Sequence, residues 1–302
     1  MKIAKYKFSD ESEKRAYVHE CDGVFEAQLD SAVEKISEIE RLRVITLSGP
    51  TCSGKTTTAA KLVSELTAKG KKVHVISIDD FYYNRDFLVE RAKKEGTPLD
   101  FESVRTIDLH ALSEVIEEIF DKDFVILPKY DFESGTRKSE QRLEIDDSDI
   151  FIFEGIQALY PEVTALLSHH NFVSVYVSVA EALTVGSVVF DANEVRFFRR
   201  LVRDYNFRGS SPEFTFEIWK SVRENEDKNI YPYCTGCDVR LNSLLGYDIS
   251  MLKPYLIPLL DSIESGSEYY GIAQDMIKKM AHIEEIDSDY MPDISVFHEF
   301  LG

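Results

Sequence analysis

A glycine-rich segment constrains this chain more than any other part of its sequence. Residues 49–56 read GPTCSGKT, which fits the pattern GxxxxGK[S/T]. The β-branched run VITLS precedes the segment, and a helical pattern, TTAAKLVSEL, follows it. In this setting glycines let the backbone curl, so that its N–H groups and the positive end of the next helix face phosphate oxygens. The segment therefore predicts a loop that binds the phosphates of a nucleotide.

The residue types inside this loop fit particular roles. We expect Lys55 to reach the β- and γ-phosphates and the Thr56 hydroxyl to bind Mg²⁺. The strand before the motif and the helix after it disfavour the alternative, a glycine-rich turn without function. Cys52 is expected to serve packing rather than redox control. The residues predicted to bind the nucleotide here are Gly49, Pro50, Thr51, Cys52, Ser53, Gly54, Lys55, Thr56 and Thr57.

Short apolar runs alternate with helical patterns along much of the chain. The runs that predict buried parallel strands are residues 44–47, 73–78, 124–127, 150–153 and 172–179. Helical spacing is clearest over residues 109–120, and a further helix is expected over 24–42. This alternation predicts an α/β fold with a doubly wound parallel sheet.

We also expect a simple division of the chain. Residues 1–43 form a helical lead-in, and residues 44–250 form the core, with a lid near 194–232. Past residue 195 the strand patterns stop and helices take over. Residues 251–302 form a helical extension that packs on the core, because their apolar stripe has helical spacing.

The composition limits the partners of the chain. Its 302 residues include 35 Lys and Arg against 54 Asp and Glu, so the net charge is −19. Bulk electrostatics therefore oppose binding to nucleic acid or to an anionic membrane. No apolar run approaches the ~18 residues of a membrane span. Four cysteines do not make a disulfide framework, and the single CxxC at Cys234 and Cys237 is weak evidence for zinc. We expect a cytoplasmic protein.

Carboxylates follow two of the predicted strands. The strand VHVISI leads into Asp79 and Asp80, and the strand IFIF leads into Glu154. Ligands of open α/β sheets bind at this edge, where a carboxylate can accept the proton of an attacking hydroxyl or hold a metal ion. Adjacent side chains diverge, so only one of Asp79 and Asp80 is expected to face the phosphates. A helix N-cap is the alternative for this pair.

Four arginines are spaced to share one face of a helix. They are Arg196, Arg199, Arg200 and Arg203. Like charges stacked in this way repel one another, and phosphates bound by the guanidinium groups would neutralise them. The alternative is a solvated face on which Arg200 pairs with Asp204.

In this order and spacing, the motifs resemble the uridine kinase/phosphoribulokinase family of P-loop kinases. The segments that carry the resemblance are GPTCSGKTT, SIDDFYYN, DFESVRTIDL, PKYDFESGTRK, FIFEGIQALY and RRLVRDYNFRG. The C-terminal third resembles a bacterial uridine-kinase-like subgroup, whose members often carry an N-terminal segment similar to threonyl-tRNA synthetase. We expect the residues before position 44 to be too few for that whole segment.

The resemblance implies a P-loop NTPase-type fold with a helical lid and transfer of the γ-phosphate of ATP or GTP to a nucleoside 5′-hydroxyl, with Mg²⁺. It implies that Asp79 is the catalytic base and that Glu154 lies with Thr56 near the metal. The residues that it implies for holding phosphates are Lys55, Arg199, Arg200 and Arg203. Those that it implies for binding the acceptor are Asp79, Tyr82, Phe101, Glu102, Tyr130, Arg137 and Arg208. Self-association is an expectation of the same kind.

Three residues depart from the family pattern. Glu102 stands where uridine kinases carry an aspartate that binds the ribose hydroxyls. Gly135 replaces the histidine that reads the pyrimidine edge, and Ser210 replaces the second arginine of an RGR motif. A site without a partner for the base edge loses a basis for discrimination. We expect a uridine or cytidine kinase. A kinase for another alcohol or a sugar phosphate, and a nucleotide-binding regulator with little turnover, stay open.

Overall fold

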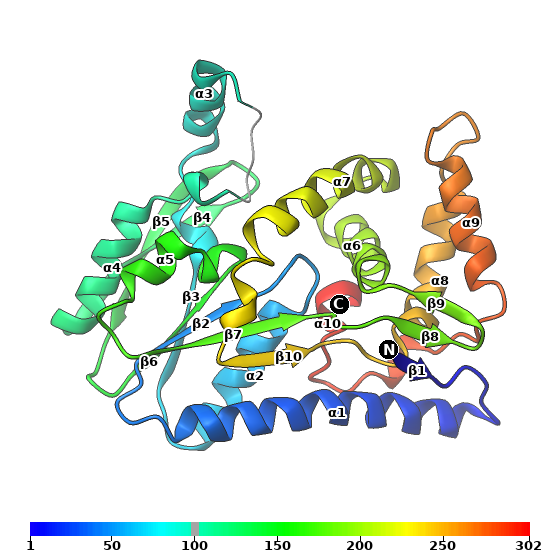
Figure 1. The fold of residues 1–302 in the computed structure, drawn as a ribbon, viewed down its shortest axis with the longest axis horizontal. Helices are drawn as coiled ribbons and strands as arrows, with labels where there is room; N and C mark the ends of the chain where they lie inside the picture. Colours follow the sequence, from blue (N-terminus) through cyan, green and yellow to red (C-terminus); the bar gives the residue numbers. More distant parts are fainter. Residues whose placement is uncertain (98–102) are drawn as a thin grey trace.

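A parallel sheet of five strands forms the centre of the computed structural model, which describes residues 1–97 and 103–302 (Figure 1). In spatial order the strands are β10 (Val239–Asn242), β7 (Phe172–Ser178), β2 (Val44–Ser48), β6 (Ile150–Glu154) and β3 (Val73–Ser77). The predicted α/β class is therefore confirmed. The order places the loop that follows β2 between the ends of β7 and β6.

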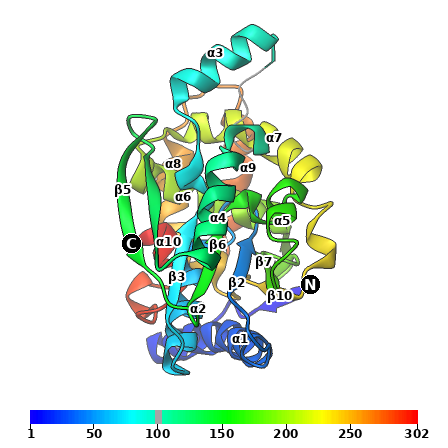
Figure 2. The same cartoon turned by 90° about the vertical axis from the view of Figure 1, so that its left-hand side faces the viewer.

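Both faces of the sheet are covered, which explains the continuous apolar runs of its inner strands. Ile45 of β2 and Phe151 of β6 lie on opposite faces of the sheet and belong to different core clusters. Helices α1 (Glu11–Ser37) and α2 (Lys55–Ala68) pack in the first cluster. Helices α4 (Leu109–Asp121) and α5 (Pro161–Leu166) pack in the second (Figure 2).

Two predictions about strands are wrong. Residues 124–127 belong to β4 (Phe124–Asp131), which pairs antiparallel with β5 (Thr136–Glu144) in a separate hairpin. A short apolar run does not distinguish a central parallel strand from a hairpin strand buried on one face. Strands also continue beyond residue 195, because β10 joins the sheet parallel to β7. Its sequence, VRLN, is too short to give a clear pattern.

The N-terminal part differs in its bounds from the prediction. Helix α1 begins at Glu11 rather than near residue 24, because the Asp10 side chain caps it by accepting from the Glu13 amide. Before it, β1 (Lys2–Ala4) pairs parallel with β8 (Leu183–Val185), which pairs in turn with β9 (Val188–Phe190).

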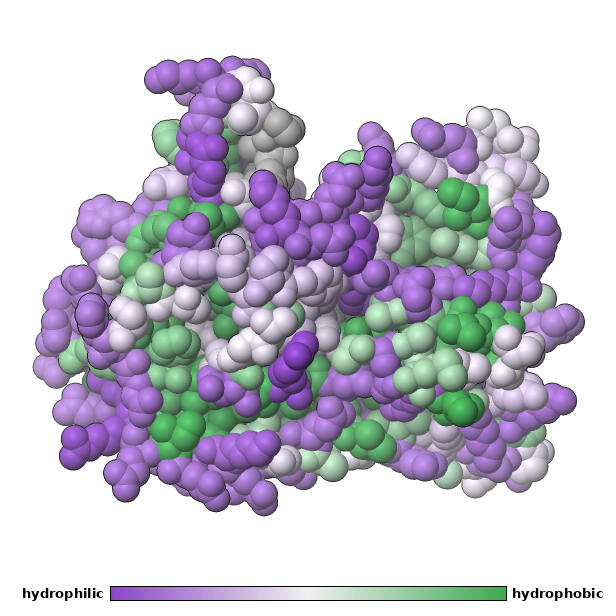
Figure 3. All heavy atoms as spheres, in the orientation of Figure 1, coloured by the Kyte–Doolittle hydropathy of each residue, from purple (hydrophilic) through white to green (hydrophobic). Residues whose placement is uncertain are grey.

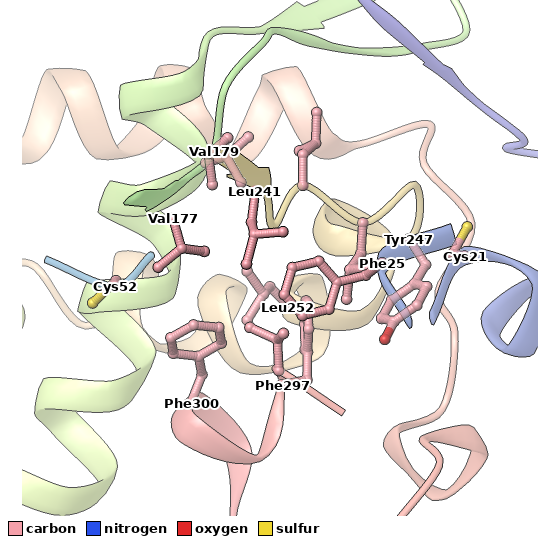
Figure 4. Packing of buried hydrophobic residues seen from close by; sticks show 14 of the residues in the cluster. Cys21, Phe25, Cys52, Val177, Val179, Leu241, Tyr247, Leu252, Phe297 and Phe300 are labelled. Carbon is pink, nitrogen blue, oxygen red and sulfur yellow. The ribbon is translucent and has the colours of Figure 1, made fainter. Parts of the chain in front are cut away.

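Helices make up most of the chain beyond β9. They are α6 (Ala192–Arg208), α7 (Pro212–Asn229), α8 (Asp248–Asp261), α9 (Tyr270–Met280) and α10 (His298–Leu301). Helix α3 (Arg85–Glu95) stands away from the body near the β4–β5 hairpin (Figure 1). Phe297 and Phe300, close to the C-terminus, lie in the same apolar cluster as Phe25 of α1 and Leu252 of α8 (Figure 4). This packing brings the end of the chain beside the phosphate loop.

The surface is mostly hydrophilic on the face drawn in Figure 3, where hydrophobic residues gather over β8 and β9. Val189 of β9 and Ile3 of β1 are among the exposed apolar residues. Within the described ranges, no helix has the length and apolar content needed to cross a membrane.

Candidate active site

The backbone of the loop after β2 has two residues in the left-handed region. Cys52 and Gly54 have positive φ values of 57° and 84°. A Cβ atom on Gly49 would overlap the carbonyl oxygen of Val177, and one on Gly54 would lie 2.6 Å from Cγ1 of Val296. Both glycines are therefore required by close contacts, and Gly54 also by its left-handed backbone.

The inner surface of this loop has polar groups without protein partners. Gly54 is the N-cap of α2 and offers no side-chain cap, so the first amides of the helix lack intrahelical acceptors. The Oγ atom of Ser53 is buried and has no hydrogen-bond partner among the described residues. Lys55 donates from Nζ to the carbonyl oxygen of Pro50 at 3.1 Å, and Thr56 is exposed. These groups fit a phosphate chain, with Mg²⁺ on the Thr56 hydroxyl.

Two carboxyl groups lie at the same edge of the sheet as the loop. Glu154 ends β6 and pairs in register with Leu47 and Ser77, while Asp79 lies in a short 3₁₀ helix, η1 (Ile78–Phe81), that follows β3. Neither carboxyl group forms a hydrogen bond or ion pair with any described residue. They are therefore available for a substrate or a metal ion.

Burial raises the pKa values of both carboxyl groups. The pKa of Glu154 rises to about 7, mainly through desolvation, while Lys55 opposes the rise and Asp79 adds to it. Desolvation also raises the pKa of Asp79, against the attraction of Lys55 and Arg208. The two acids and the lysine thus form one electrostatic group beside the loop.

Asp80 diverges from Asp79, as the sequence predicts. Its Oδ1 accepts from the Tyr130 amide at 3.0 Å, and its Oδ2 accepts from Nζ of Lys129 at 3.0 Å. Asp80 therefore ties η1 to β4. Neither aspartate caps a helix, because the N-cap of η1 is Ser77.

Most of the described residues that the sequence predicts to bind the acceptor lie in η1, just after it, or in the β4–β5 hairpin. The rings of Tyr82 and Tyr130 lie 5.6 Å apart, and Gln157 donates from Nε2 to the Tyr82 hydroxyl at 3.0 Å. Arg137 donates to the carbonyl oxygen of Phe81 at 2.8 Å and also contacts Asp108 at 3.2 Å. Arg137 thus holds the hairpin to η1. Two other expected acceptor residues, Phe101 and Glu102, lie outside the described residues.

Arg85 is a candidate site residue that sequence reasoning missed. A Cβ atom on Gly135, which has a φ of 70°, would lie 2.7 Å from Cβ of Arg85. The Arg85 guanidinium donates to the carbonyl oxygen of Phe132 at 2.6 Å. It therefore lies across the position where a side chain at residue 135 would stand. A lone arginine at the start of a helix gives no signal of this placement.

The first half of the arginine stripe is buried in ion pairs. Arg196 is 1% exposed, and its Nη1 lies 2.6 Å from Oε1 of Glu226 in α7. The same atom donates to the carbonyl oxygen of Thr51 at 3.1 Å, so it also supports the phosphate loop. The stripe is therefore not a solvated face.

Arg199 has a different position from the one expected. Its Nε and Nη2 bind the carboxylate of Asp248 at 2.6 and 2.7 Å. The other contacts of the guanidinium are the carbonyl oxygens of Ser243 and Cys52, at 2.8 and 3.4 Å, and the Ser243 hydroxyl, at 3.5 Å. With its donors engaged and its side chain fully buried, Arg199 supports the loop from behind. We therefore do not propose it as a phosphate ligand.

Arg200 and Arg203 share one carboxylate. Asp204 accepts from Nε of Arg200 at 3.1 Å, and from Nε and Nη2 of Arg203 at 2.9 and 2.6 Å. Arg208 approaches the same carboxylate at 3.6 Å and is largely exposed. The pair of Arg200 with Asp204, which belonged to the alternative of a solvated face, is present, although both side chains are buried. Two acids, Asp204 and Glu299 at 3.9 Å from Arg203, do not neutralise three guanidiniums, so this end of the stripe keeps a positive charge that suits phosphate.

Together, a phosphate loop, a nearby carboxyl group and cationic side chains on an adjoining helix define a P-loop phosphotransferase. Residues 44–250 match the model of the family described as "Phosphoribulokinase / Uridine kinase family". The chain belongs to this family, and it is therefore a nucleotide-binding kinase that phosphorylates a hydroxyl group.

Relatives and one solved structure agree with this assignment. A uridine kinase of Lactobacillus johnsonii is 28% identical over 170 residues, which span 56% of this chain and 71% of the relative. A uridine kinase of Clostridium botulinum (strain Langeland) is 30% identical over 187 residues, 61% and 79% of the two chains. A crystal structure from Silicibacter sp. TM1040, named for a fructose transport system kinase, covers 70% of this chain and 98% of its own. Its TM-score is 0.52 at 17% identity, a likeness of fold alone.

Proposed function

We propose that this protein transfers the γ-phosphate of ATP to the 5′-hydroxyl of a nucleoside, with uridine and cytidine as the first acceptors to test. The observation that carries the proposal is the Asp79 carboxyl group, which has no hydrogen-bond or ion-pair partner among the described residues and lies at the same sheet edge as Lys55 and the loop. Two curated relatives named uridine kinase support the choice of acceptor. A cytoplasmic location and self-association stay predictions.

In the mechanism that we propose, Asp79 accepts the proton of the acceptor hydroxyl as its oxygen attacks the γ-phosphorus. Burial raises the pKa of this carboxyl group, which strengthens it as a proton acceptor, while the charges of Lys55 and Arg208 oppose the rise and favour its ionised form. Lys55, Arg200 and Arg203 neutralise charge on the transferring group. Thr56 and Glu154 would hold Mg²⁺, whose charge would further neutralise that of the phosphates.

A panel of acceptors tests the proposal. ADP release is measured with ATP and Mg²⁺ across nucleosides, sugar phosphates and hydroxy acids. We expect the largest kcat/KM with uridine or cytidine. Nucleotide binding without turnover on any acceptor would favour the regulator that the sequence leaves open. Failure to bind ATP or GTP would contradict the assignment of the loop.

A second acceptor class is favoured by Arg85. This side chain is exposed and forms no ion pair with a described residue, and its charge opposes the rise that burial causes in the pKa of Tyr130. A guanidinium binds a carboxylate or phosphate through two parallel hydrogen bonds. An alcohol that carries such an anionic group is therefore the second candidate acceptor.

The variant Arg85→Gln separates the two acceptor classes. For an anionic acceptor we expect KM to rise about tenfold or more, because a charge-assisted pair is lost. For a neutral nucleoside the KM should change much less. Arg91, on the same helix, packs over the rings of Tyr83 and Phe87 and provides a matched Arg91→Gln control.

A further inference from the structure

The C-terminal segment, residues 295–302, packs directly against the phosphate loop. Val296, Phe297 and Phe300 are fully buried, and Figure 4 shows the two phenyl rings within the apolar cluster. Cγ1 of Val296 lies 2.6 Å from the point that a Cβ atom on Gly54 would occupy. Displacement of the segment would expose these three apolar side chains to water, which is unfavourable. The segment is therefore held in place beside the loop.

The segment is also fastened to helix α6. The side chain of Asn206 donates from Nδ2 to the carbonyl oxygen of Phe300 at 3.3 Å. The guanidinium of Arg199 lies 5.1 Å from the centre of the Phe300 ring and 5.6 Å from that of Phe297. The C-terminal segment therefore bridges the loop, through Val296, and the arginine-bearing helix α6.

This packing holds Glu299 beside the phosphate site. Its Oε1 lies 3.9 Å from Nη1 of Arg203, and its side chain is 17% exposed. Its Oε2 is buried without a hydrogen-bond partner among the described residues. Asp204 already binds Nε and Nη2 of Arg203, so Nη1 lies on the edge left for another acceptor. Glu299 is also close enough to Glu154 for its charge to raise the pKa of that residue.

We propose that Glu299 is an internal competitor of the phosphates of the bound nucleotide for the free edge of Arg203. The inference rests on the proposed function, in which the loop and Arg203 bind phosphate. In the free enzyme the carboxylate partly compensates Arg203. When a nucleotide binds, the same fixed charge repels the incoming phosphates. Compensation of Arg203 in the free enzyme and repulsion of the phosphates in the complex both lower nucleotide affinity. The direction of this change therefore does not depend on how the nucleotide is oriented in the site.

The consequence for turnover is faster release of ADP. Product release limits kcat in many kinases and other enzymes that close over their substrates. A carboxylate fixed beside the phosphates weakens product binding without taking part in the transfer step.

The test is the variant Glu299→Gln, which removes the charge and keeps the shape. Calorimetry with MgADP and with a non-hydrolysable MgATP analogue should show about fivefold tighter binding at low salt. The gain should shrink as salt is added, because screening weakens the repulsion that the variant removes. ADP should dissociate more slowly in stopped-flow displacement. Unchanged or weaker nucleotide binding would overturn the proposal.

Three further variants keep the test specific. Glu264→Gln removes the same unit of charge from an exposed glutamate in the α8–α9 connection and should bind nucleotide like the wild type. Glu299→Asp keeps the charge and should stay close to the wild type. Glu299→Met is a second charge-free variant of similar length, measured if Glu299→Gln fails to fold by thermal melting.

Lys55→Ala separates failure of this inference from failure of the proposed function. Loss of nucleotide binding in Lys55→Ala, together with unchanged affinity in Glu299→Gln, would refute the competitor alone. Unimpaired binding in Lys55→Ala would refute the proposed function, because the loop would then not be the nucleotide site.

Discussion

The two adjacent aspartates at the end of β3 show how surroundings assign roles to identical side chains. Asp80 accepts hydrogen bonds from β4 through both carboxylate oxygens and so links η1 to β4. Asp79 has no protein partner of this kind among the described residues, and burial raises its pKa. The sequence predicts that only one of the two faces the phosphates. Sequence spacing alone does not say which, whereas the family resemblance selects Asp79.

Replacing Asp79 tests its role as the base. In Asp79→Asn we expect kcat to fall about a thousandfold, because the amide cannot accept the acceptor proton. Nucleotide affinity by calorimetry should not fall, since the loop and Lys55, rather than Asp79, are the groups proposed to bind the phosphates. Asp80→Asn is the control and should lower the melting temperature more than it lowers kcat. Turnover near the wild-type rate in Asp79→Asn would remove this residue as the base.

The raised pKa of Glu154 predicts a dependence of stability on pH. Its pKa rises from an ordinary value of 4.5 to about 7 on folding, so the folded state binds a proton that the unfolded state has lost between these values. Stability therefore falls as pH rises through this window, by about 3 kcal/mol in total above it. Glu154→Gln should remove this loss.

The measurement is urea unfolding of both proteins without nucleotide or divalent cations. The difference in unfolding free energy between Glu154→Gln and the wild type should grow from pH 5 to pH 8, about the span of the two pKa values. Glu140→Gln, in the exposed β5 strand, is the control and should show no such trend. A constant difference across the range would contradict the buried, protonated state of Glu154.

At the scale of elements, the sequence predicts the strands whose residues are buried, because burial requires apolar side chains. The strands at residues 44–47, 73–78, 150–153 and 172–179 are confirmed, because the central ones are buried on both faces and read as continuous apolar runs. The run at 124–127 is apolar like the others, but it pairs in a hairpin. Its partner strand β5, TRKSEQRLE, is largely polar. Strand pairing is a non-local property that a short apolar run does not encode.

The helix with the arginine stripe shows the same limit. Its spacing predicts one cationic face, and the sequence identifies a need for counter-charges. The structure supplies two of them from Glu226 of α7 and Asp248 of α8. Neither residue stands in a recognisable motif, so their contacts with Arg196 and Arg199 come only from tertiary packing.

The buried pair of Arg196 with Glu226 fixes α7 on α6. In Glu226→Gln we expect a loss of about 3–5 kcal/mol of unfolding free energy, because Arg196 would keep a buried charge without its main partner. Chemical denaturation measures this loss. Glu224→Gln on the same helix is the matched control, since Glu224 pairs with Lys220 on the surface at 3.8 Å. That control should change stability by less than about 1 kcal/mol. Equal effects in the two variants would contradict the assignment.

At the scale of the whole molecule, the site depends on contacts between distant parts of the chain. Gly54 meets Val296 and Arg203 meets Glu299, and no local pattern marks either contact. The loop itself is predicted well, because its function requires residues at fixed spacing. The C-terminal wall of the site is not predicted, because the sequence pattern of residues 251–302 shows only that helices pack on the core.

One buried network joins the two ends of the chain and gives the last prediction. The hydroxyl of Tyr247, at the start of α8, donates to Asp22 of α1 at 2.6 Å and lies 3.0 Å from the hydroxyl of Ser295. Burial raises the pKa of Asp22, and the Tyr247 hydrogen bond opposes this rise.

In Tyr247→Phe the carboxyl group of Asp22 loses that donor, so we expect the unfolding free energy to fall by about 1–3 kcal/mol. The loss should be larger at higher pH, where Asp22 must ionise without the donor. Tyr255→Phe, whose hydroxyl lies 2.8 Å from that of Ser288 in a less buried place, is the control in the same urea titrations. If both variants lose equally little, the ends of the chain are held together by apolar packing alone.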